Sequence, residues 1–262
     1  MPHWVRFEHQ GTISIGTLDG STIAEFHGDL FSSPTPSGRS LALHDVRLLA
    51  PFRPNSVVGL WNNFHERAEK EGQAIPEVPL YFLKPTSSVI GPGEAIVRPR
   101  GHGGKVIFEA ELGIVIGREC REVSVDAARD FIFGYTCVND VTAVEVLFAD
   151  KAFQQWSRSK GYDTFTPIGP CISTGLDLPA ARVLAHLDGR PCQDYPVSDM
   201  IFSPHQVVSV LSHMQTLVPG DLISCGTSLG VRTMKPGSTI QISIRGIGTL
   251  SNSFVDLPAA KL

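Results

Sequence analysis

The stretch Phe108-Glu109-Ala110-Glu111-Leu112-Gly113-Ile114-Val115-Ile116 combines two carboxylates with a continuous apolar run. Its first half alternates between apolar and polar residues and its second half is apolar, which is typical of a strand that enters a protein core. Side chains two residues apart on a strand share a face, so the pattern predicts that Glu109 and Glu111 point the same way. Two like charges side by side in a partly buried site require a compensating cation or proton.

A second segment, Phe133 to Asp140, is an apolar strand that ends in the polar pair Asn139-Asp140. Asp140 is the third carboxylate that could join Glu109 and Glu111. Three carboxylates without a cysteine or an obvious histidine partner favour Mg²⁺ or Mn²⁺, with Ca²⁺ also possible, over zinc or copper. Spacing alone leaves a second interpretation open, in which the glutamates lie on a solvated edge strand and Asp140 caps a helix.

The remaining pattern predicts many strands and few helices. Ser203 as N-cap and Pro204 at the first helical position give one helix a clear start. Helices are expected at 64–71, 141–151 and 204–213, and strands at 56–60, 81–83, 106–116, 131–138, 222–225, 239–245 and 249–255. The sequence therefore predicts an α+β fold dominated by β-structure.

The first 50 residues have a character of their own. Residues 4–26 alternate weakly, and Asp19-Gly20 marks a tight turn, so this segment predicts a small antiparallel meander. The breaker cluster of residues 32–38 is expected to be a surface connection. We predict a small N-terminal β domain over residues 1–50 and a catalytic domain over residues 51–262.

Composition excludes several classes of protein. A formal net charge of −4 over 262 residues, with no run of Lys or Arg, argues against nucleic acid as a partner. The five cysteines are odd in number and contain no C-x-x-C pair, so a reducing compartment is expected and a disulfide framework is not. No stretch approaches the roughly 20 apolar residues of a membrane span. A cytoplasmic enzyme without a membrane partner is the resulting expectation.

Several short motifs follow one another in a fixed order between residues 55 and 255. They are Val58-Gly59-Leu60 ahead of His65, Tyr81-Phe82-Leu83-Lys84-Pro85, Glu109-Ala110-Glu111-Leu112, Gly134-Tyr135-Thr136 through Asp140, Trp156 with Lys160 to Phe165, residues 167–170, residues 199–202, residues 217–221, and Gly226-Thr227. In order and spacing this set resembles the fumarylacetoacetate hydrolase family, including its 2-hydroxyhepta-2,4-diene-1,7-dioate isomerase and acylpyruvate hydrolase members. The resemblance implies a mixed β-roll, a homodimer, a divalent metal on Glu109, Glu111 and Asp140, and a small-molecule 2-oxo acid substrate.

The same resemblance implies roles for further residues. His65 stands at the position of the catalytic base, which requires a carboxylate to orient it. Ala68 replaces the usual glutamate, so Glu69, one helical turn beyond His65, is the preferred partner and Glu66 the alternative. A solvated helix with an incidental histidine is the competing interpretation.

Lys160 matches a lysine whose charge neutralises a substrate oxyanion or carboxylate, although most lysines merely lie on the surface. Thr227 matches a substrate-contacting turn, in which Ser228 replaces the usual proline. The polar stretch from Asn63 to Glu77, with little apolar anchoring, is expected to form a lid over bound substrate.

One departure from the family pattern bears on the substrate. After Asp140, many hydrolytic members carry an Arg-Asp pair and a Gln, whereas this chain has Val144, Glu145 and Leu147. The leading hypothesis is a metal-dependent hydrolase that cleaves a C–C bond of an acylpyruvate-like 1,3-dicarbonyl acid. The alternatives are a decarboxylase or isomerase of 2-oxo diacids from aromatic catabolism, or a non-catalytic metal-binding or small-molecule-binding relative.

Overall fold

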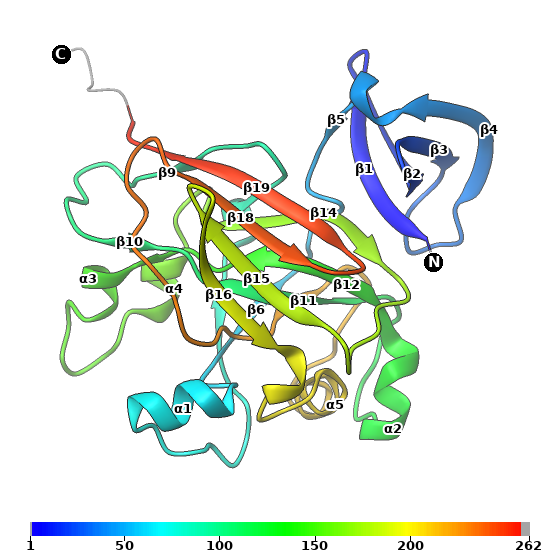
Figure 1. Ribbon diagram of the computed structural model, residues 1–262. Helices are drawn as coiled ribbons and strands as arrows, with labels where there is room; N and C mark the ends of the chain where they lie inside the picture. The colour runs from blue at the N-terminus through cyan, green and yellow to red at the C-terminus, as the bar shows by residue number, and fades with distance from the viewer. Residues whose placement is uncertain (1, 258–262) are drawn as a thin grey trace.

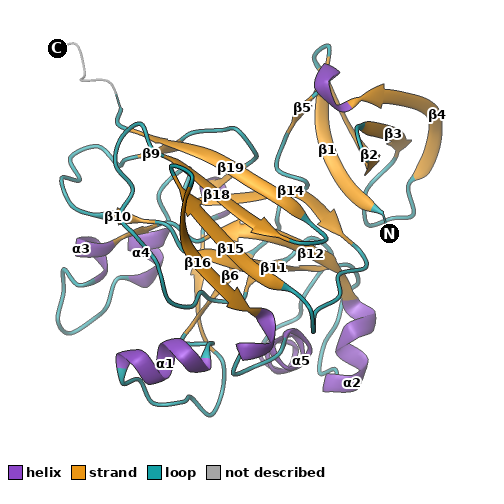
Figure 2. Ribbon diagram, viewed as in Figure 1, coloured by secondary structure: helices purple, strands orange, loops and turns teal. Residues whose placement is uncertain are grey.

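The computed structural model describes residues 2–257 and shows a β-rich body with a smaller strand lobe at its side (Figure 1). Strands dominate and the helices lie at the periphery (Figure 2), which confirms the predicted α+β, β-dominated fold. None of the helices within the described residues is long and apolar enough to cross a membrane.

The lobe is built from the N-terminal strands, whose pairing is that of an antiparallel meander. The strands are β1 (His3–His9), β2 (Thr12–Asp19), β3 (Thr22–His27), β4 (Thr35–Ala42) and β5 (Arg47–Leu48). The tight turn is present one residue later than predicted: Asp19 still belongs to β2 and pairs with Thr22, and the loop residues are Gly20, at φ 56°, and Ser21. Residues 32–38 are not wholly a connection, because Thr35 begins β4 and pairs with His27. The division into domains at residue 50 stays a prediction.

The lobe joins the body through a large mixed sheet of 12 strands. Its main path runs β4-β3-β2-β1-β14-β12-β11-β17-β6-β7, while β5 pairs with β1 and β8 pairs with β14. The body strands of this sheet are β6 (Val57–Trp61), β7 (Leu80–Lys84), β8 (Val89–Ile90), β11 (Ala110–Ile116), β12 (Ile132–Asn139), β14 (Thr166–Ser173) and β17 (Leu222–Ser224).

A second sheet of five strands packs over β11, β12 and β14 and closes the core. Its order is β16-β15-β18-β19-β9, and its strands are β9 (Ile96–Val97), β15 (Arg182–Leu187), β16 (Arg190–Pro196), β18 (Thr239–Ile244) and β19 (Gly248–Val255). Every residue of β11 is buried because the strand is covered on both faces and paired on both edges. Apolar side chains of β11 such as Leu112 and Ile114 belong to the main core cluster, with burial that stabilises the fold.

The helices are short and sit at strand ends. They are α1 (His65–Glu71), α2 (Val125–Ala128), α3 (Val144–Leu147), α4 (Trp156–Lys160) and α5 (Pro204–Met214). The predictions for α1 and α5 are confirmed: α1 stops at Gly72 in the left-handed region, and α5 begins with a capping box between Ser203 and Gln206.

The helix expected at 141–151 is wrong. Thr142 and Ala143 form strand β13, which pairs with β10 (Val106–Ile107), and only the single turn of α3 follows. Beyond it the Asp150 carboxylate accepts the backbone N–H of Ala152 at 2.8 Å, which favours a turn over a continued helix.

Candidate metal centre and substrate cleft

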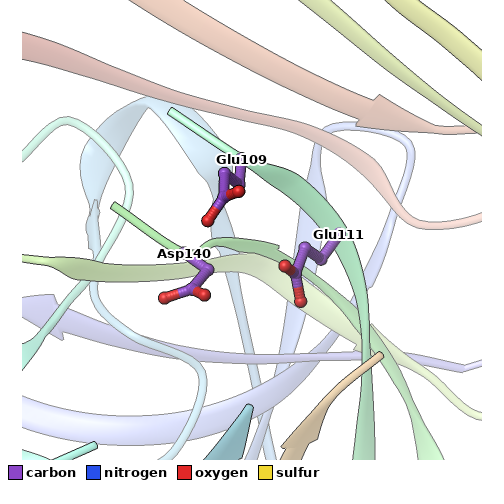
Figure 3. Close-up of side chains that lie close together, drawn as sticks. All are labelled: Glu109, Glu111 and Asp140. Carbon is purple, nitrogen blue, oxygen red and sulfur yellow. The ribbon is translucent and has the colours of Figure 1, made fainter. Parts of the chain in front are cut away.

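The body strands β11 and β12 bring the three predicted metal ligands together. Antiparallel pairing aligns Ala110 with Asn139, so Glu109 and Glu111 flank the end of β12 at which Asp140 emerges. The strand predicted over 106–116 breaks at Glu109, whose N–H donates to the Asn139 side chain at 3.1 Å instead of to a ladder partner. One oxygen from each of Glu109, Glu111 and Asp140 lies within 4.8 Å of the others (Figure 3).

The proximity of the three carboxylates disfavours ionisation of Glu111. Burial, followed by the charges of Asp140 and Glu109, raises the pKa of Glu111 to about 8. Its Oε2 accepts hydrogen bonds from the Ser224 hydroxyl at 2.5 Å and from the Gly226 N–H at 2.8 Å. These two donors fix the carboxylate and favour its ionised form, but burial and the neighbouring charges outweigh them, and a nearby cation would favour ionisation further.

Lys160 lies against the carboxylates, while the role toward a substrate that the family resemblance implied for it stays a prediction. Its Nζ donates to Asp140 Oδ2 at 2.6 Å and to the Thr142 hydroxyl at 2.7 Å, and also contacts Glu109 Oε2. Burial alone would lower the pKa of Lys160, but Asp140 and Glu109 raise it above its usual value. Lys160 is therefore charged at neutral pH and holds two of the three carboxylates.

Lys84 is a second buried cation, and it was not singled out from the sequence. Its Nζ donates to Asp140 Oδ1 and to the Phe165 carbonyl, the latter at 2.8 Å. Burial alone would raise the pKa of Asp140, but Lys160 and Lys84 hold it below its ordinary value. Lys84 belongs to the motif Tyr81 to Pro85, which contributed to the family resemblance, but the motif by itself indicated no role for the lysine.

The donor set fits a divalent metal. Glu109, Glu111 and Asp140 offer only carboxylate oxygens, which are the ligands of Mg²⁺, Mn²⁺ and Ca²⁺. Nitrogen and sulfur ligands are absent from this cluster of described residues, which disfavours zinc. Burial and two neighbouring negative charges raise the pKa of Glu111, and a cation bound beside it would counteract this repulsion.

A cleft of about 320 Å³ opens beside Glu109 and Lys160. Arg67 of α1 reaches into it, with its Nη1 3.5 Å from Glu109 Oε1 and 3.4 Å from the Thr227 carbonyl. Its Nε donates to Glu71 at 3.0 Å. Arg67 was missed from the sequence because it lies 42 residues from Glu109 and only the packing of α1 brings the two together.

His65, Glu66 and Glu69 are exposed and do not line this cleft. Within residues 2–257 no hydrogen bond or ion pair joins His65 to either glutamate, and the α1 carboxylate that lines the cleft is Glu71. The base role of His65 and its pairing with Glu69 therefore stay predictions.

Thr227 is buried beneath the metal ligands. Its hydroxyl donates to the Ala110 carbonyl at 2.8 Å and accepts from Gln193 at 2.9 Å. Gln193 in turn accepts the Ala110 N–H at 3.1 Å, so both side chains fix the peptide between Glu109 and Glu111. The hydroxyl of Thr227 is thus used inside the protein, and its contact with substrate stays a prediction.

One wall of the cleft is apolar where the family pattern led us to look for an arginine and a glutamine. Val144 and Leu147 line it. Glu145 turns away, and its Oε2 accepts the Lys105 N–H at 2.8 Å. On this wall of the cleft, apolar side chains therefore stand where the family pattern has polar groups.

The β-rich fold holds a buried acidic triad whose donor set fits a divalent cation, and comparison with known proteins gives the family. Residues 56–255 match the family described as fumarylacetoacetate (FAA) hydrolase C-terminal, and the chain belongs to it. Residues 3–51 match a second family described as Rv2993c-like, N-terminal.

Individual relatives extend over nearly the whole chain. Protein Rv2993c of Mycobacterium tuberculosis is 39% identical over 92% of this chain and 96% of its own length. The structure of 2-hydroxyhepta-2,4-diene-1,7-dioate isomerase from Mycobacterium marinum is 37% identical, covers 98% of this chain and 99% of its own, and superposes with a TM-score of 0.89. The resemblance predicted from the motifs is confirmed.

A more distant relative was solved with a metal. Maleylpyruvate hydrolase from Sphingobium sp. SYK-6, in complex with manganese(II) ion and pyruvate, is 25% identical over 98% of this chain and 100% of its own, with a TM-score of 0.80. Together with the buried triad, this relative supports a divalent metal as the cofactor of the present chain.

Proposed function

We propose that this protein is a divalent-metal-dependent hydrolase that cleaves a C–C bond of an acylpyruvate-like 2-oxo acid. The observation that carries the proposal is the buried triad of Glu109, Glu111 and Asp140, of which Glu109 lines a cleft that Lys160 and Arg67 also line. Mg²⁺ or Mn²⁺ held by the triad would supply a Lewis acid for the carboxylate and adjacent oxygen of a 2-oxo acid.

The side chains around the triad have distinct tasks in this proposal. Lys160 presents a fixed positive charge where negative charge develops on the substrate oxygen, and the surrounding protein keeps that charge from being screened by water. Arg67 presents a guanidinium at the cleft wall, suited to orient a carboxylate. Thr227 and Gln193 of β16 hold the backbone of Ala110, the residue between Glu109 and Glu111.

Hydrolysis needs a base for the attacking water. His65 is the proposed base: it takes a proton from water as the new C–O bond forms at the acyl carbonyl, and the breaking C–C bond leaves the enolate of pyruvate. That enolate then takes up a proton, so the products are a carboxylic acid and pyruvate. Because His65 is exposed on α1 and does not line the cleft, this role requires bound substrate to extend beyond the cleft lining toward the start of α1.

Isomerisation is the second candidate, favoured by the 37% identity to a protein named as an isomerase of a heptadiene dioate. Moving a proton along a conjugated 2-oxo acid uses the same cation and needs no positioned water. Decarboxylation of a 2-oxo diacid would use the same groups.

The three reactions are separated by product analysis. The purified protein with Mn²⁺ or Mg²⁺ is incubated with acylpyruvates, oxaloacetate and a 2-hydroxydienedioate, and the products are followed by NMR. Pyruvate plus a free acid from an acylpyruvate is the expected result. Turnover of the dienedioate or oxaloacetate alone would replace hydrolysis by isomerisation or decarboxylation, and no turnover on any compound would favour a non-catalytic binding protein. A homodimer, which the family also leads us to propose, is checked by sedimentation.

A further inference from the structure

The cleft beside the triad has two chemically different ends. At the inner end Lys160 and Arg67 lie against Glu109. The rest of the lining is largely apolar and aromatic, with Trp61 from β6, Trp156 from α4 and residues of α3 and the position after it (Figure 1 shows α3 and α4 side by side at one edge of the body). A ligand that fills the cleft therefore meets charge at one end only.

Arg67 is prepared to take a carboxylate at the inner end. Its side chain is 20% exposed, and Glu71 and Glu109 hold two of its nitrogens. Its Nη2 forms no hydrogen bond among residues 2–257 and is left for a ligand. A guanidinium fixed along one edge and open along another binds a carboxylate with little loss of side-chain entropy.

The apolar part of the lining includes aromatic rings that pack on one another. Trp156 stacks on Phe82 with ring centroids 5.6 Å apart and planes at 19°, and Trp61 lies 5.6 Å from Trp156. The same cleft is lined by Leu147, which is buried, and by Phe148, which is 61% exposed. Phe148 is a large apolar side chain left uncovered at the cleft, and covering it by an apolar ligand group would be favourable.

A second carboxylate would find no cation along this wall. The cations that line the cleft within the described residues are Arg67 and Lys160, both at the triad. The polar side chains near the aromatic wall are the uncharged Gln73 and Gln154, and Gln154 already accepts the Trp156 ring N–H at 3.1 Å. A carboxylate placed here would lose water without gaining a charged partner, which is costly.

We propose that the cleft selects 2-oxo acids that carry a single carboxylate and an apolar alkyl or aryl tail, and rejects those with a second carboxylate at the far end. The carboxylate end lies with Arg67, Lys160 and the triad, and the tail lies against Trp61, Trp156, Leu147 and Phe148. This inference rests on the proposed function and narrows its substrate class to monoacids.

Three ligands test the proposal by calorimetric titration of the Mn²⁺-loaded protein. Pyruvate has no tail, 2-oxohexanoate adds an apolar tail, and 2-oxoadipate has a tail of similar length with a terminal carboxylate. We expect 2-oxohexanoate to bind roughly tenfold more tightly than pyruvate, because its tail leaves water for an apolar wall. 2-Oxoadipate should bind no more tightly than pyruvate. Equal or tighter binding of 2-oxoadipate than of 2-oxohexanoate would overturn the inference and leave the proposed function intact.

A protein that binds Mn²⁺ but none of the three ligands would instead overturn the proposed function, and the inference with it. A matched pair of variants tests the wall itself. Phe148→Arg adds a cation to the cleft lining, whereas Phe153→Arg adds one at a 72% exposed position of the same loop that does not line the cleft. Phe148→Arg should shift the preference toward 2-oxoadipate by roughly tenfold, while Phe153→Arg should leave it unchanged. An equal response of both variants, or of neither, would contradict the placement of the tail.

Discussion

At the scale of single residues, Glu111 controls when the site can accept a cation. Its pKa is raised to about 8 in the metal-free protein, so below that pH its carboxylate is largely protonated. Asp140 has a lowered pKa and is already ionised. A metal must therefore displace a proton from Glu111, and its apparent affinity depends on pH.

We predict that Mn²⁺ affinity rises about tenfold per pH unit from pH 6 to near pH 8 and levels off above it, since a single proton is displaced. Calorimetric titration at pH 7 in two buffers of different ionisation enthalpy should report the release of about one proton per ion. Binding that releases no proton at pH 7 would show that Glu111 is already ionised.

His65 is the residue whose role is least determined by the contacts in the fold. If it is the base, His65→Ala should lower kcat by about 10²-fold or more while Mn²⁺ affinity stays unchanged, because His65 is not among the ligands. His44→Ala, at a side chain that is 82% exposed in the N-terminal lobe, is the control. An unchanged kcat for His65→Ala would leave Glu71, which lines the cleft, as the α1 side chain to examine next.

The site could be predicted from the sequence only where local pattern and strand ends specify it. Alternation placed Glu109 and Glu111 together, and the end of an apolar strand marked Asp140. Lys84, Arg67 and Gln193 reach the site from β7, α1 and β16, through contacts that join residues far apart in the chain. The pattern within one segment carries no information about such contacts. These three residues could therefore be assigned to the site only from the folded structure.

At the scale of elements, α1 is better anchored than its polar sequence suggested. Asn63 and Phe64 are buried, Asn63 donates to the Cys225 carbonyl at 2.9 Å, and the Asp199 carboxylate accepts the Glu66 N–H at 3.1 Å. The expectation of little anchoring is wrong for this part of the proposed lid. After Gly72 the chain is exposed through Val78 except at the half-buried Pro76, so a mobile lid is restricted to residues 72–78.

We predict that residues 72–78 gain protection from hydrogen exchange when Mn²⁺ and oxalate are added together, because closure over the ligand would bury backbone amides. Mn²⁺ alone should protect them less. Equal exchange in all states would show that this segment does not close, and the start of α1 at residues 63–68 serves as an internal reference.

Helices and strands could be predicted where a capping motif or a periodic pattern was strong. They were missed where pairing with a distant strand determined the secondary structure. The capping box at Ser203 defined α5, whereas Thr142 and Ala143 became a strand because β10 lies beside them. The hairpin of β15 and β16 was missed although Asp188-Gly189 is a turn signal, with φ of 52° and 74° at its two residues.

At the scale of the whole molecule, the two sheets hold a central strand rigidly enough to keep like charges together. β11 is paired on both edges and covered on both faces, and Gln193 and Tyr195 from the second sheet both bond to the Ala110 peptide. Burial of this strand costs the carboxylates their water, and the ion pairs of Lys84 and Lys160 with Asp140 and Glu109 offset part of that cost. The fold thus leaves Glu111 as the carboxylate of the triad that forms no ion pair among the described residues.

The most direct test of this account is the stoichiometry of Mn²⁺ binding, measured by electron paramagnetic resonance at pH 8 for the native chain, Glu111→Gln and Glu25→Gln. Glu25 is a carboxylate that is also buried, at 8% exposure, but belongs to β3 of the N-terminal lobe. The account predicts one tightly bound ion per chain for the native protein and for Glu25→Gln, and at least about hundredfold weaker binding for Glu111→Gln. Absence of a bound ion in the native protein, or equal binding by Glu111→Gln, would contradict it.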